Sequence, residues 1–468
     1  MVHAVLVASP GIGHLIPMVE LGKRLLTHHG FHVTIFVVTT DPSTTTSQLL
    51  HQTSNLNSLN IVLVPPLDVS HKLPPNTSLE ARIGLTMILS LPFLRSKILS
   101  ITHPPPSSLI VDIFGLAALP IARDLRMLTY VFFTTSAWFS AVTLFLPFMD
   151  RKMIDNHAQS HEPLFVPGCD PVRFQDTLES LLSPGGDMFE GYLKAAREIV
   201  TVDGILMNTW RDLEPVATRA VREHGSLGQF VYPVGPLVRT VEKKAEHAVL
   251  RWLDRQPRES VIYVSFGSGG TMSEGQMREV ALGLELSQQR FVWVVRPPND
   301  GASGWFFEVA SGDGDDVALS GLPEGFAKRT ESVGFVVPMW APQAEILGHP
   351  ATGGFVTHCG WNSVLESVMN EVPMVAWPLY AEQKMNAFML SEKLRVAVRV
   401  AEEDGGVVRR EQVAEVVRRV MVGEDGLGMR NKVKELKVSA EKALSVSGSS
   451  HASLSQITHN FQPLLQTP

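Results

Sequence analysis

The chain has 468 residues, which is enough for about two or three domains, and 44% of them are hydrophobic, as in an ordinary globular protein. Its net charge is −7 and it has no basic stripe with interleaved aromatic residues, which excludes the usual electrostatic pattern of a nucleic-acid-binding protein. The only cysteines, Cys169 and Cys359, are too few for a disulfide framework and match no zinc motif, so we expect a reducing, cytoplasmic compartment.

Short apolar segments followed by turns and amphipathic helices recur through the first half of the chain. The helix after the first strand has apolar residues at helical spacing, with Pro17 in its first turn and Gly30 as its C-cap. This alternation predicts a parallel sheet with helices on both faces. The predicted strands are residues 4–8, 32–38, 61–64, 109–111, 130–133 and 204–208.

Residues 128–149 carry no charge over a length that could span a bilayer. Tyrosine, valine and phenylalanine favour a strand at 130–133, and Thr134, Thr135 and Ser136 mark a polar turn before an apolar helix. We therefore expect this segment to lie in the core of the protein, with no membrane contact.

A segment rich in proline, glycine and charge, residues 232–247, is the predicted linker between two domains. After it the pattern of strands and helices begins again, which predicts a second doubly wound domain. Residues 299–321 are predicted to be a glycine- and acid-rich insertion. The predicted strands of the second half are residues 261–266, 291–295, 335–338, 354–357 and 374–377.

The loop SPGIGHLIP follows the first predicted strand, at the sheet edge where open parallel sheets bind ligands. It is not a dinucleotide-binding fingerprint, because Ile16 stands where the third glycine is needed and the second strand has no acidic end. His14 lies at the entry of a helix, whose dipole disfavours imidazolium, so it is either a general base or a residue that only caps the turn. Asp112 ends another strand and is predicted to orient His14, to cap the helix from Leu116, or both.

Two later turns could hold an anion. In VSFGSGGTMSEGQ, residues 264–276, glycines and Ser268 suit a phosphate, and Ser273 with Gln276 forms a capping-box pattern. In THCGWNSVLES, residues 357–367, polar residues meet a helix N-terminus, and Glu366 lies one turn further along. Glycine turns and first-turn acids are common in proteins without ligands, so each turn alone is a moderate signal.

Residues 340–383, WAPQAEILGHPATGGFVTHCGWNSVLESVMNEVPMVAWPLYAEQ, resemble the complete signature of the plant secondary-product glycosyltransferases. With GIGHLIP and SFGSGG in their expected places, the resemblance extends over nearly the whole chain. It implies a plant family 1 UDP-sugar-dependent glycosyltransferase with the α/β GT-B fold, in which two doubly wound Rossmann-like domains face each other across a cleft. The implied domains are 1–240 for the acceptor and 248–444 for the UDP-sugar, with a C-terminal helix at about 445–468 packing back on the first domain.

The resemblance also implies the donor site. Trp340 would stack on uracil, the Ala341 backbone would pair with the uracil edge, and Gln343 and Glu366 would lie at the ribose. The remaining implied donor residues are Ser268, His358, Asn362 and Ser363 at the diphosphate, Thr135, Trp361, Glu382 and Gln383 at the sugar, and Tyr380 in the same site.

His14 resembles the catalytic base of the family, and Asp112 its partner. A helix N-terminus and His358 can hold the departing diphosphate, so neither a metal nor a cofactor is expected. The residues that could line the acceptor pocket, unless they are ordinary core residues, are Ile12, Phe114, Trp138 and Phe139.

The expected reaction is inverting transfer of glucose from UDP-glucose to a hydroxyl of a phenolic, phenylpropanoid or flavonoid-type molecule, giving a β-glucoside and UDP. Gln383 is typical of glucose users, and SPGIGHLIP, WLDRQP and VSFGSGGT resemble the hydroquinone and monolignol glucosyltransferase (arbutin synthase) branch. The alternatives are C-glucosylation of an aromatic carbon and a non-catalytic sugar-nucleotide-binding protein, while the missing fingerprint argues against a NAD-dependent oxidoreductase. We expect a monomer whose partners are small molecules.

Overall fold

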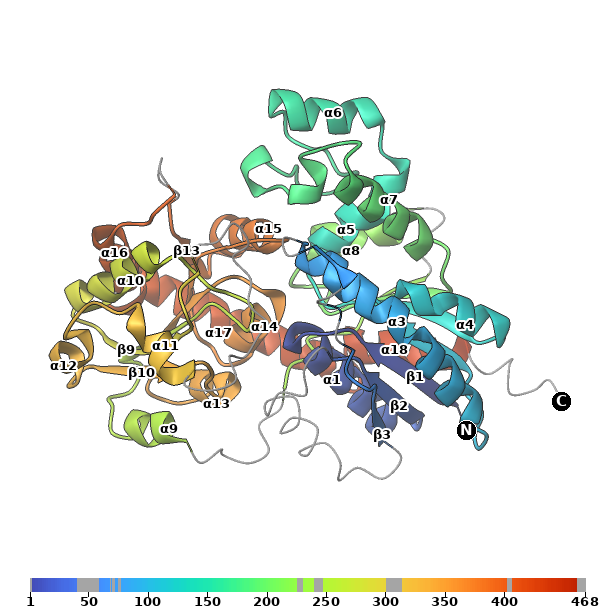
Figure 1. Cartoon of the computed structure of the whole chain (residues 1–468), viewed down its shortest axis with the longest axis horizontal. Coiled ribbons are helices and arrows are strands. Elements are labelled where there is room, and N and C mark those ends of the chain that lie inside the picture. The colour runs from blue at the N-terminus through green and yellow to red at the C-terminus, as the bar shows by residue number, and fades with distance from the viewer. Residues whose placement is uncertain are drawn as a thin grey trace. The chain divides into compact units, whose positions relative to one another are not determined.

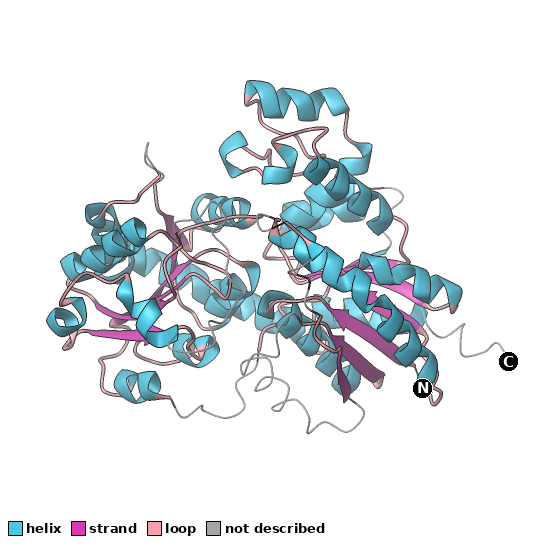
Figure 2. Cartoon of the chain, viewed as in Figure 1, coloured by secondary structure: helices cyan, strands magenta, loops and turns pink. Residues whose placement is uncertain are grey.

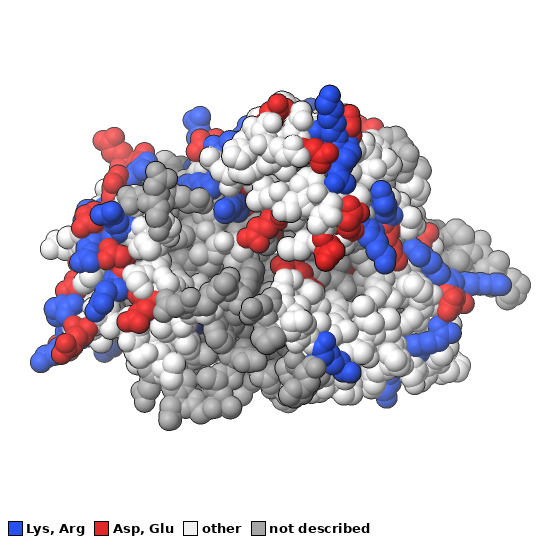
Figure 3. Space-filling view, turned by 45° about the horizontal axis from the view of Figure 1, so that its top comes forward, with Lys and Arg blue, Asp and Glu red and all other residues white. Residues whose placement is uncertain are grey.

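The computed structural model describes residues 2–39, 59–67, 69, 72–74, 77–224, 230–239, 247–299, 314–401 and 406–460. The chain forms two compact units, Met1–Val238 together with Ser439–Pro468, and Arg239–Val438. In each unit, strands form a sheet that helices cover (Figure 2). On the face of the molecule drawn in Figure 3, basic and acidic side chains are interspersed among uncharged residues.

The first unit is built on a seven-stranded parallel sheet with the order β3-β2-β1-β4-β5-β6-β7. Figure 1 labels β1, β2 and β3 of this sheet. The apolar strands β1, β4 and β6 are buried along their whole length, as expected for a parallel sheet with helices on both faces. The strands are β1 (His3–Ala8), β2 (His32–Val37), β3 (Leu59–Leu63), β4 (Ser108–Val111), β5 (Leu128–Phe133), β6 (Gly204–Met207) and β7 (Val231–Pro233).

Helices from both ends of the chain pack on this sheet. The last one, α18, contacts β7 and α1, and its Leu454 and Ile457 join the same buried cluster as Leu6 of β1. Ser450 Oγ of α18 donates a hydrogen bond of 2.6 Å to the Gly235 carbonyl. The α-helices of the unit are α1 (Ile12–His29), α3 (Leu79–Ser100), α4 (Leu119–Asp124), α5 (Ala137–Phe145), α6 (Arg151–Ser160), α7 (Asp187–Ile199), α8 (Pro215–Glu223) and α18 (Ser449–Asn460).

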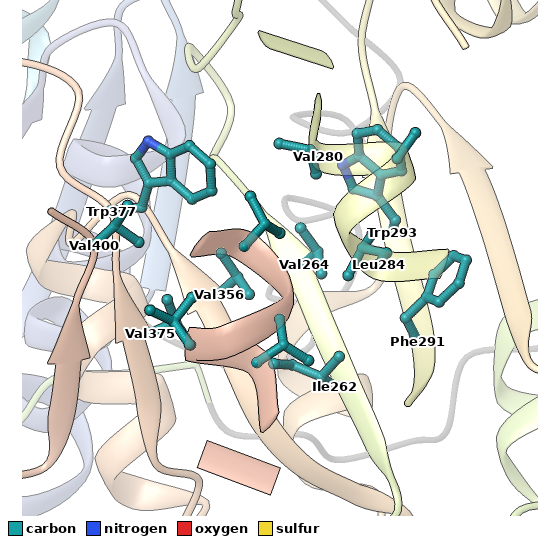
Figure 4. Packing of buried hydrophobic residues seen from close by; sticks show 14 of the residues in the cluster. Ile262, Val264, Val280, Leu284, Phe291, Trp293, Val356, Val375, Trp377 and Val400 are labelled. Carbon is teal, nitrogen blue, oxygen red and sulfur yellow. The ribbon is translucent and has the colours of Figure 1, made fainter. Parts of the chain in front are cut away.

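The second unit contains a six-stranded parallel sheet with the order β10-β9-β8-β11-β12-β13. Figure 4 shows its core, where Ile262 and Val264 of β8 lie among side chains from neighbouring strands and from α10, including Val280 and Leu284. The strands are β8 (Val261–Ser265), β9 (Arg290–Val295), β10 (Gly334–Pro338), β11 (Thr352–Thr357), β12 (Met374–Ala376) and β13 (Ala397–Arg399).

Helices α10 and α16 pack closely on each other in this unit. A Cβ on Gly283 of α10 would approach Val413 of α16 to 2.5 Å, so the close crossing requires glycine. The α-helices are α9 (Ala248–Leu253), α10 (Glu274–Ser287), α11 (Gly314–Ser320), α12 (Phe326–Thr330), α13 (Gln343–Leu347), α14 (Trp361–Met369), α15 (Gln383–Phe388), α16 (Arg410–Met421) and α17 (Glu424–Leu444), which runs across the division between the units.

Every predicted strand is present within two residues of its predicted bounds, but β7 and β13 were not predicted. The predicted linker 232–247 therefore begins inside β7, and its residues 240–246 lie outside the described part of the chain. Of the predicted insertion, residues 300–313 also lie outside the described part, and 314–320 form α11. Pro17 lies in the second turn of α1, because that helix already begins at Ile12, and Gly30 is the C-cap as predicted.

The charge-free segment 128–149 lies in the core as predicted, since it forms β5, a turn and the fully buried α5. Ser273 caps α10 as predicted by accepting a hydrogen bond from Gln276 N. The reciprocal half of the capping box is absent, because the Gln276 side chain bonds to the backbone of Val408 instead. By length and composition, α3 is the one helix in the described ranges that could cross a membrane, and 33% of its apolar window is buried.

Candidate active site

In each unit, two of the loops that carry candidate functional residues follow neighbouring central strands. In the first sheet the strand order changes direction between β1 and β4, and in the second between β8 and β11. Loops leave such strands in opposite directions and open the crevice in which α/β sheets bind ligands. His14 and Asp112 follow β1 and β4, whereas Gly267 and His358 follow β8 and β11.

His14 stands in the first turn of α1, beside a buried carboxylate. Its Nδ1 lies 3.3 Å from Asp112 Oδ2 and 3.5 Å from Thr134 Oγ1. The His14 side chain is 19% exposed, whereas that of Asp112 is fully buried. A proton on Nδ1 that is donated to Asp112 fixes the tautomer in which Nε2 carries a free lone pair. The predicted pairing of these two residues is thus present in the first unit.

Asp112 also holds the two loops that surround it. Its Oδ2 accepts hydrogen bonds from Ser9 N (3.0 Å) and Ser9 Oγ (2.6 Å), and its Oδ1 accepts from Phe114 N (3.0 Å) and Gly115 N (3.1 Å). Burial alone would raise the pKa of Asp112, but the charge of His14 and the hydrogen bonds from His14 and Ser9 lower it below its ordinary value. Asp112 therefore lies beside His14 as predicted, but the predicted cap of the helix from Leu116 is wrong, because Gly115 is the N-cap of Leu116–Ala118 without a side-chain cap and Asp112 bonds to the turn before it. Sequence reasoning missed Ser9, although a serine directly after a strand could have indicated it.

The polar turn after β5 brings Thr134 to the histidine, whereas the next residue, Thr135, is the one expected at the sugar. Thr134 Oγ1 faces His14, whereas Thr135 Oγ1 is buried without a hydrogen-bond partner among the described residues. The next residue, Ser136, caps α5 by accepting from Phe139 N at 3.3 Å. Two adjacent threonines cannot be told apart by sequence pattern, because only the local backbone decides which one faces the neighbouring loop.

Of the four residues expected to line an acceptor pocket, Phe114 contacts the histidine directly. Its ring centroid lies 5.2 Å from that of His14 in an edge-on arrangement. Ile12 is half-buried two residues before His14. Trp138 and Phe139 are buried on α5, where the indole donates to the Asp170 carbonyl at 3.2 Å and the Phe139 ring stacks on Tyr192 at 6.4 Å.

A buried carboxylate that sequence reasoning missed fixes the start of α5. Glu214 accepts hydrogen bonds from Ala137 N (2.8 Å) and Trp138 N (3.0 Å), two of the orphan donors of that helix. Burial raises the pKa of Glu214, although these hydrogen bonds and one from Thr209 act in the opposite direction. Its position shortly after β6 was the only signal in the sequence.

In the second unit, Gln343 forms hydrogen bonds with two other residues expected at the donor. Its Nε2 donates to Glu366 Oε2 at 2.7 Å and to Ser363 Oγ at 2.9 Å. Burial raises the pKa of Glu366 to about 7, although the hydrogen bond from Gln343 and the charge of Arg239 lower it. Glu366 is therefore a buried acid held in place by a neighbouring amide, with Ser363 one turn earlier on α14.

His358 is enclosed by two glycines. A Cβ on Gly267, where φ is +78°, would come within 2.5 Å of the imidazole ring, and a Cβ on Gly360 would come within 2.4 Å. Burial lowers the pKa of His358 to about 4, so the ring is neutral at physiological pH and acts as a hydrogen-bonding group. Its Nδ1 has no hydrogen-bond partner among the described residues. Ser268, half-buried, follows Gly267 in the same loop.

The other expected donor residues lie in the loops after β10, β11 and β12. Gln383 Oε1 accepts from Leu379 N (2.9 Å) and Tyr380 N (3.1 Å), which leaves its amide nitrogen to reach a ligand. The remaining positions are half-buried Trp340 and buried Ala341 after β10, buried Trp361 and half-buried Asn362 in the first turn of α14, and half-buried Tyr380 and Glu382 before α15.

The same three loops each contain a non-glycine residue with positive φ. Met339 (61°) precedes Trp340, Cys359 (65°) follows His358, and Ala381 (53°) precedes Glu382. Such conformations cost about 1–3 kcal/mol and persist where surrounding contacts enforce them, often at ligand-binding sites. Cys359 illustrates this, because its N–H donates to Thr357 Oγ1 and its carbonyl accepts from Asn386 Nδ2.

Within the described ranges, no group of three or more histidine, cysteine or acidic side chains is arranged to hold a metal ion. Both cysteines are free thiols, Cys359 buried and Cys169 half-buried.

The chain thus has two doubly wound parallel units, each with polar loops where its strand order changes direction. This is the architecture of the GT-B class of glycosyltransferases. The family model described as UDP-glucoronosyl and UDP-glucosyl transferase matches residues 238–424. The chain is 47% identical to UDP-glycosyltransferase 72E1 of Arabidopsis thaliana, over 99% of this chain and 97% of that protein. It is 42% identical to the hydroquinone glucosyltransferase of Rauvolfia serpentina, over 98% of each. The crystal structure of TcCGT1 in complex with UDP matches with a TM-score of 0.91 at 42% identity, covering 98% of this chain and 99% of that one.

The chain therefore belongs to the plant family 1 UDP-glycosyltransferases, as its signature predicts. It is an enzyme that transfers a sugar from a UDP-sugar to plant small molecules, and its GT-B fold is confirmed.

Proposed function

We propose that this enzyme transfers glucose from UDP-glucose to the hydroxyl of a phenolic, phenylpropanoid or flavonoid-type acceptor, forming a β-glucoside and UDP. The observation that carries this proposal is the partly exposed His14 with Nδ1 at 3.3 Å from the buried Asp112. The name of the Rauvolfia relative, a glucosyltransferase for hydroquinone, supports both the sugar and a phenolic acceptor. Gln383, at the end of the signature, supports glucose as well.

In the proposed mechanism, the acceptor oxygen attacks the anomeric carbon of glucose from the face opposite UDP. Its proton moves to His14 Nε2, the bond from the anomeric carbon to the β-phosphate oxygen breaks, and the bonding electrons leave with UDP. Phenols have pKa values near 10 and ordinary imidazole near 6.5, so deprotonation before attack would cost about 5 kcal/mol. Proton transfer therefore accompanies attack, and Asp112 stabilises the imidazolium that forms. Back-side attack on α-linked UDP-glucose inverts the configuration.

The donor is held by the loops of the second unit. We assign uracil to Trp340 and Ala341, and the ribose hydroxyls to Glu366 with Gln343. The diphosphate belongs to Ser268, His358, Asn362 and Ser363, near the N-terminus of α14, and the sugar to Trp361, Glu382, Gln383 and, from the first unit, Thr135. Neutral hydrogen-bond donors and a helix N-terminus stabilise the charge that grows on the leaving UDP, so we propose that no metal is needed.

The test is a panel of phenols incubated with UDP-glucose and, separately, UDP-galactose, with products identified by mass spectrometry and by acid hydrolysis. We expect acid-labile β-glucosides from the wild type, and no turnover above background from His14→Ala while it still binds UDP. Acid-resistant products would indicate C-glucosylation in place of the proposed O-glucosylation. If no acceptor gave a product, the result would favour a non-catalytic binding protein. Full activity of His14→Ala would refute the role of His14 as the base.

A monomeric state and a cytoplasmic location are parts of the same proposal.

A further inference from the structure

A hollow beside the glycine-rich loop after β8 is lined in part by Arg296, which is half-buried. Arg296 directly follows β9, the strand that pairs with β8. It lines the hollow together with Ser265, Gly267 and Gly270 from the loop and Trp293 from β9. Arg296 therefore shares this hollow with the turn that encloses His358 and includes Ser268.

The described residues do not balance the charge of Arg296. Its Nε is buried without a hydrogen-bond partner. Burial lowers the pKa of Arg296, and the one described ionisable group that acts against this shift is the phenol of Tyr380, not a carboxylate. A guanidinium nevertheless stays protonated in proteins, and a buried cation is costly unless an anion accompanies it. Arg296 is thus a half-buried cation whose Nε is shielded from water, and no carboxylate among the described residues balances its charge.

The groups assigned to the diphosphate, by contrast, carry no positive charge. Ser268, Asn362 and Ser363 are neutral donors, and His358 is neutral at physiological pH because burial lowers its pKa to about 4. Neutral donors orient phosphate oxygens, but they do not cancel a full negative charge. The cation after β9 and the anion assigned to Ser268 would then both lie at the loop after β8.

We propose that Arg296 supplies the positive charge that balances the diphosphate of the UDP-sugar, acting across the Gly267–Gly270 turn. This inference rests on the proposed assignment of Ser268 and His358 to the diphosphate. Because negative charge grows on the β-phosphate as the sugar leaves, Arg296 stabilises the departing UDP more than the intact donor. Arg296 is therefore expected to affect kcat as well as donor binding.

The test compares the affinities of UDP and uridine, which differ only in the diphosphate, by isothermal titration calorimetry. Arg296→Met should weaken UDP binding by about 10- to 100-fold and leave uridine binding within about twofold, since it removes a charge interaction in a partly desolvated site. Arg296→Gln should behave in the same way, and it decides the test if the methionine variant does not fold. The wild-type affinity for UDP should fall more steeply with salt than that of either variant. Arg290→Met, at the opposite end of β9, is the matched control and should bind both ligands as the wild type does.

Two results would overturn the inference about Arg296. One is unchanged UDP affinity in the variants, and the other is an equal loss of UDP and uridine, which would indicate a purely structural role. A wild-type protein that binds UDP no more tightly than uridine would instead refute the underlying assignment of the diphosphate to this loop.

Discussion

At the scale of single residues, Asp112 serves two purposes because its two oxygens face different partners. Oδ1 accepts only from the backbone of the loop after β4, whereas Oδ2 accepts from Ser9 and lies beside His14 Nδ1. The structural role and the proposed catalytic role of Asp112 can therefore be separated, provided that the comparison controls for the lost hydrogen bonds. Asp203 offers this comparison, because it accepts from the N–H (2.8 Å) and the hydroxyl (2.7 Å) of Thr129 without a histidine partner.

Asp112→Asn should lower kcat by about 100- to 10,000-fold, because an amide stabilises neither the imidazolium nor the required tautomer of His14. Both Asp112→Asn and Asp203→Asn should reduce the free energy of unfolding by about 1–3 kcal/mol through weakened hydrogen bonds. Steady-state kinetics and denaturant unfolding measure the two effects. If Asp203→Asn lost as much activity as Asp112→Asn, the activity loss would reflect stability and not catalysis.

The raised pKa of Glu366 predicts that donor binding depends on pH. Its pKa is raised to about 7 by burial, so the carboxyl is mostly protonated at pH 5.5 and ionised at pH 8. Ribose hydroxyls that donate to the carboxylate favour the ionised form, so binding lowers this pKa and affinity rises with pH. Between about pH 5.5 and 8, the affinity for UDP-glucose should increase about tenfold.

The measurement is the dissociation constant of UDP-glucose across this range, since its diphosphate diester does not titrate there. Glu366→Gln should bind more weakly and show a flat profile. Glu345→Gln should shift the midpoint to lower pH, because the charge of Glu345 raises the pKa of Glu366. A wild-type profile as flat as that of Glu366→Gln would contradict the assignment of the ribose to this acid.

At the scale of elements, the start of α5 depends on a residue distant in sequence. Glu214 accepts from the first two N–H groups of α5, and the turn just before that helix carries Thr134, which faces His14. Removing the carboxylate would leave two buried donors unsatisfied and would loosen the turn next to His14. The stability of α5 and the activity of the site should therefore change together.

Glu214→Ala should destabilise the first unit by about 2–4 kcal/mol, as expected when two buried N–H groups lose their acceptor. It should also increase hydrogen exchange in α5 and raise the KM for the acceptor, with UDP affinity unchanged. Glu223→Ala, an exposed position on α8, should have none of these effects. Unchanged exchange at the N-terminus of α5 in Glu214→Ala would refute the capping role.

The same elements indicate what sequence alone can predict. Strands such as β1 and β8 are apolar runs long enough to be recognised, and they place His14 and the Gly267 turn at the sheet edge without further information. β7 and β13 have only three residues each, and β7 includes a proline, so hydrogen bonding to the neighbouring strand decides their conformation. The signature predicts donor residues as a set, but the bonds from Gln343 to Glu366 and from Gln383 to its own loop depend on tertiary geometry.

At the scale of the whole molecule, the first unit is assembled from both ends of the chain. Residues 439–468 belong to it, and α18 contributes Leu454 and Ile457 to the core that also contains Leu6 and Val234. Trp210 Nε1 donates to Ser439 Oγ at 3.0 Å, and Asn460 Nδ2 donates to the Tyr232 hydroxyl at 3.1 Å. The second unit has its own core in β8–β13 and their helices. A defect in α18 should therefore act on the first unit and spare donor binding by the second.

Leu454→Ala should destabilise the first unit by about 2–5 kcal/mol, because it opens a cavity at a side chain that is 1% exposed. UDP affinity should stay within about twofold of the wild type, since the residues assigned to UDP belong to the second unit, which has a core of its own. Unfolding followed by hydrogen exchange, which reports on the two units separately, should show faster exchange in β1 and β7 and unchanged exchange in β8 and β11. Val446→Ala, at a position that is 82% exposed between α17 and α18, is the control and should change neither unit. Equal destabilisation of both sheets by Leu454→Ala would mean that the two units unfold as one cooperative body, and the C-terminal helix would then stabilise the donor site as well.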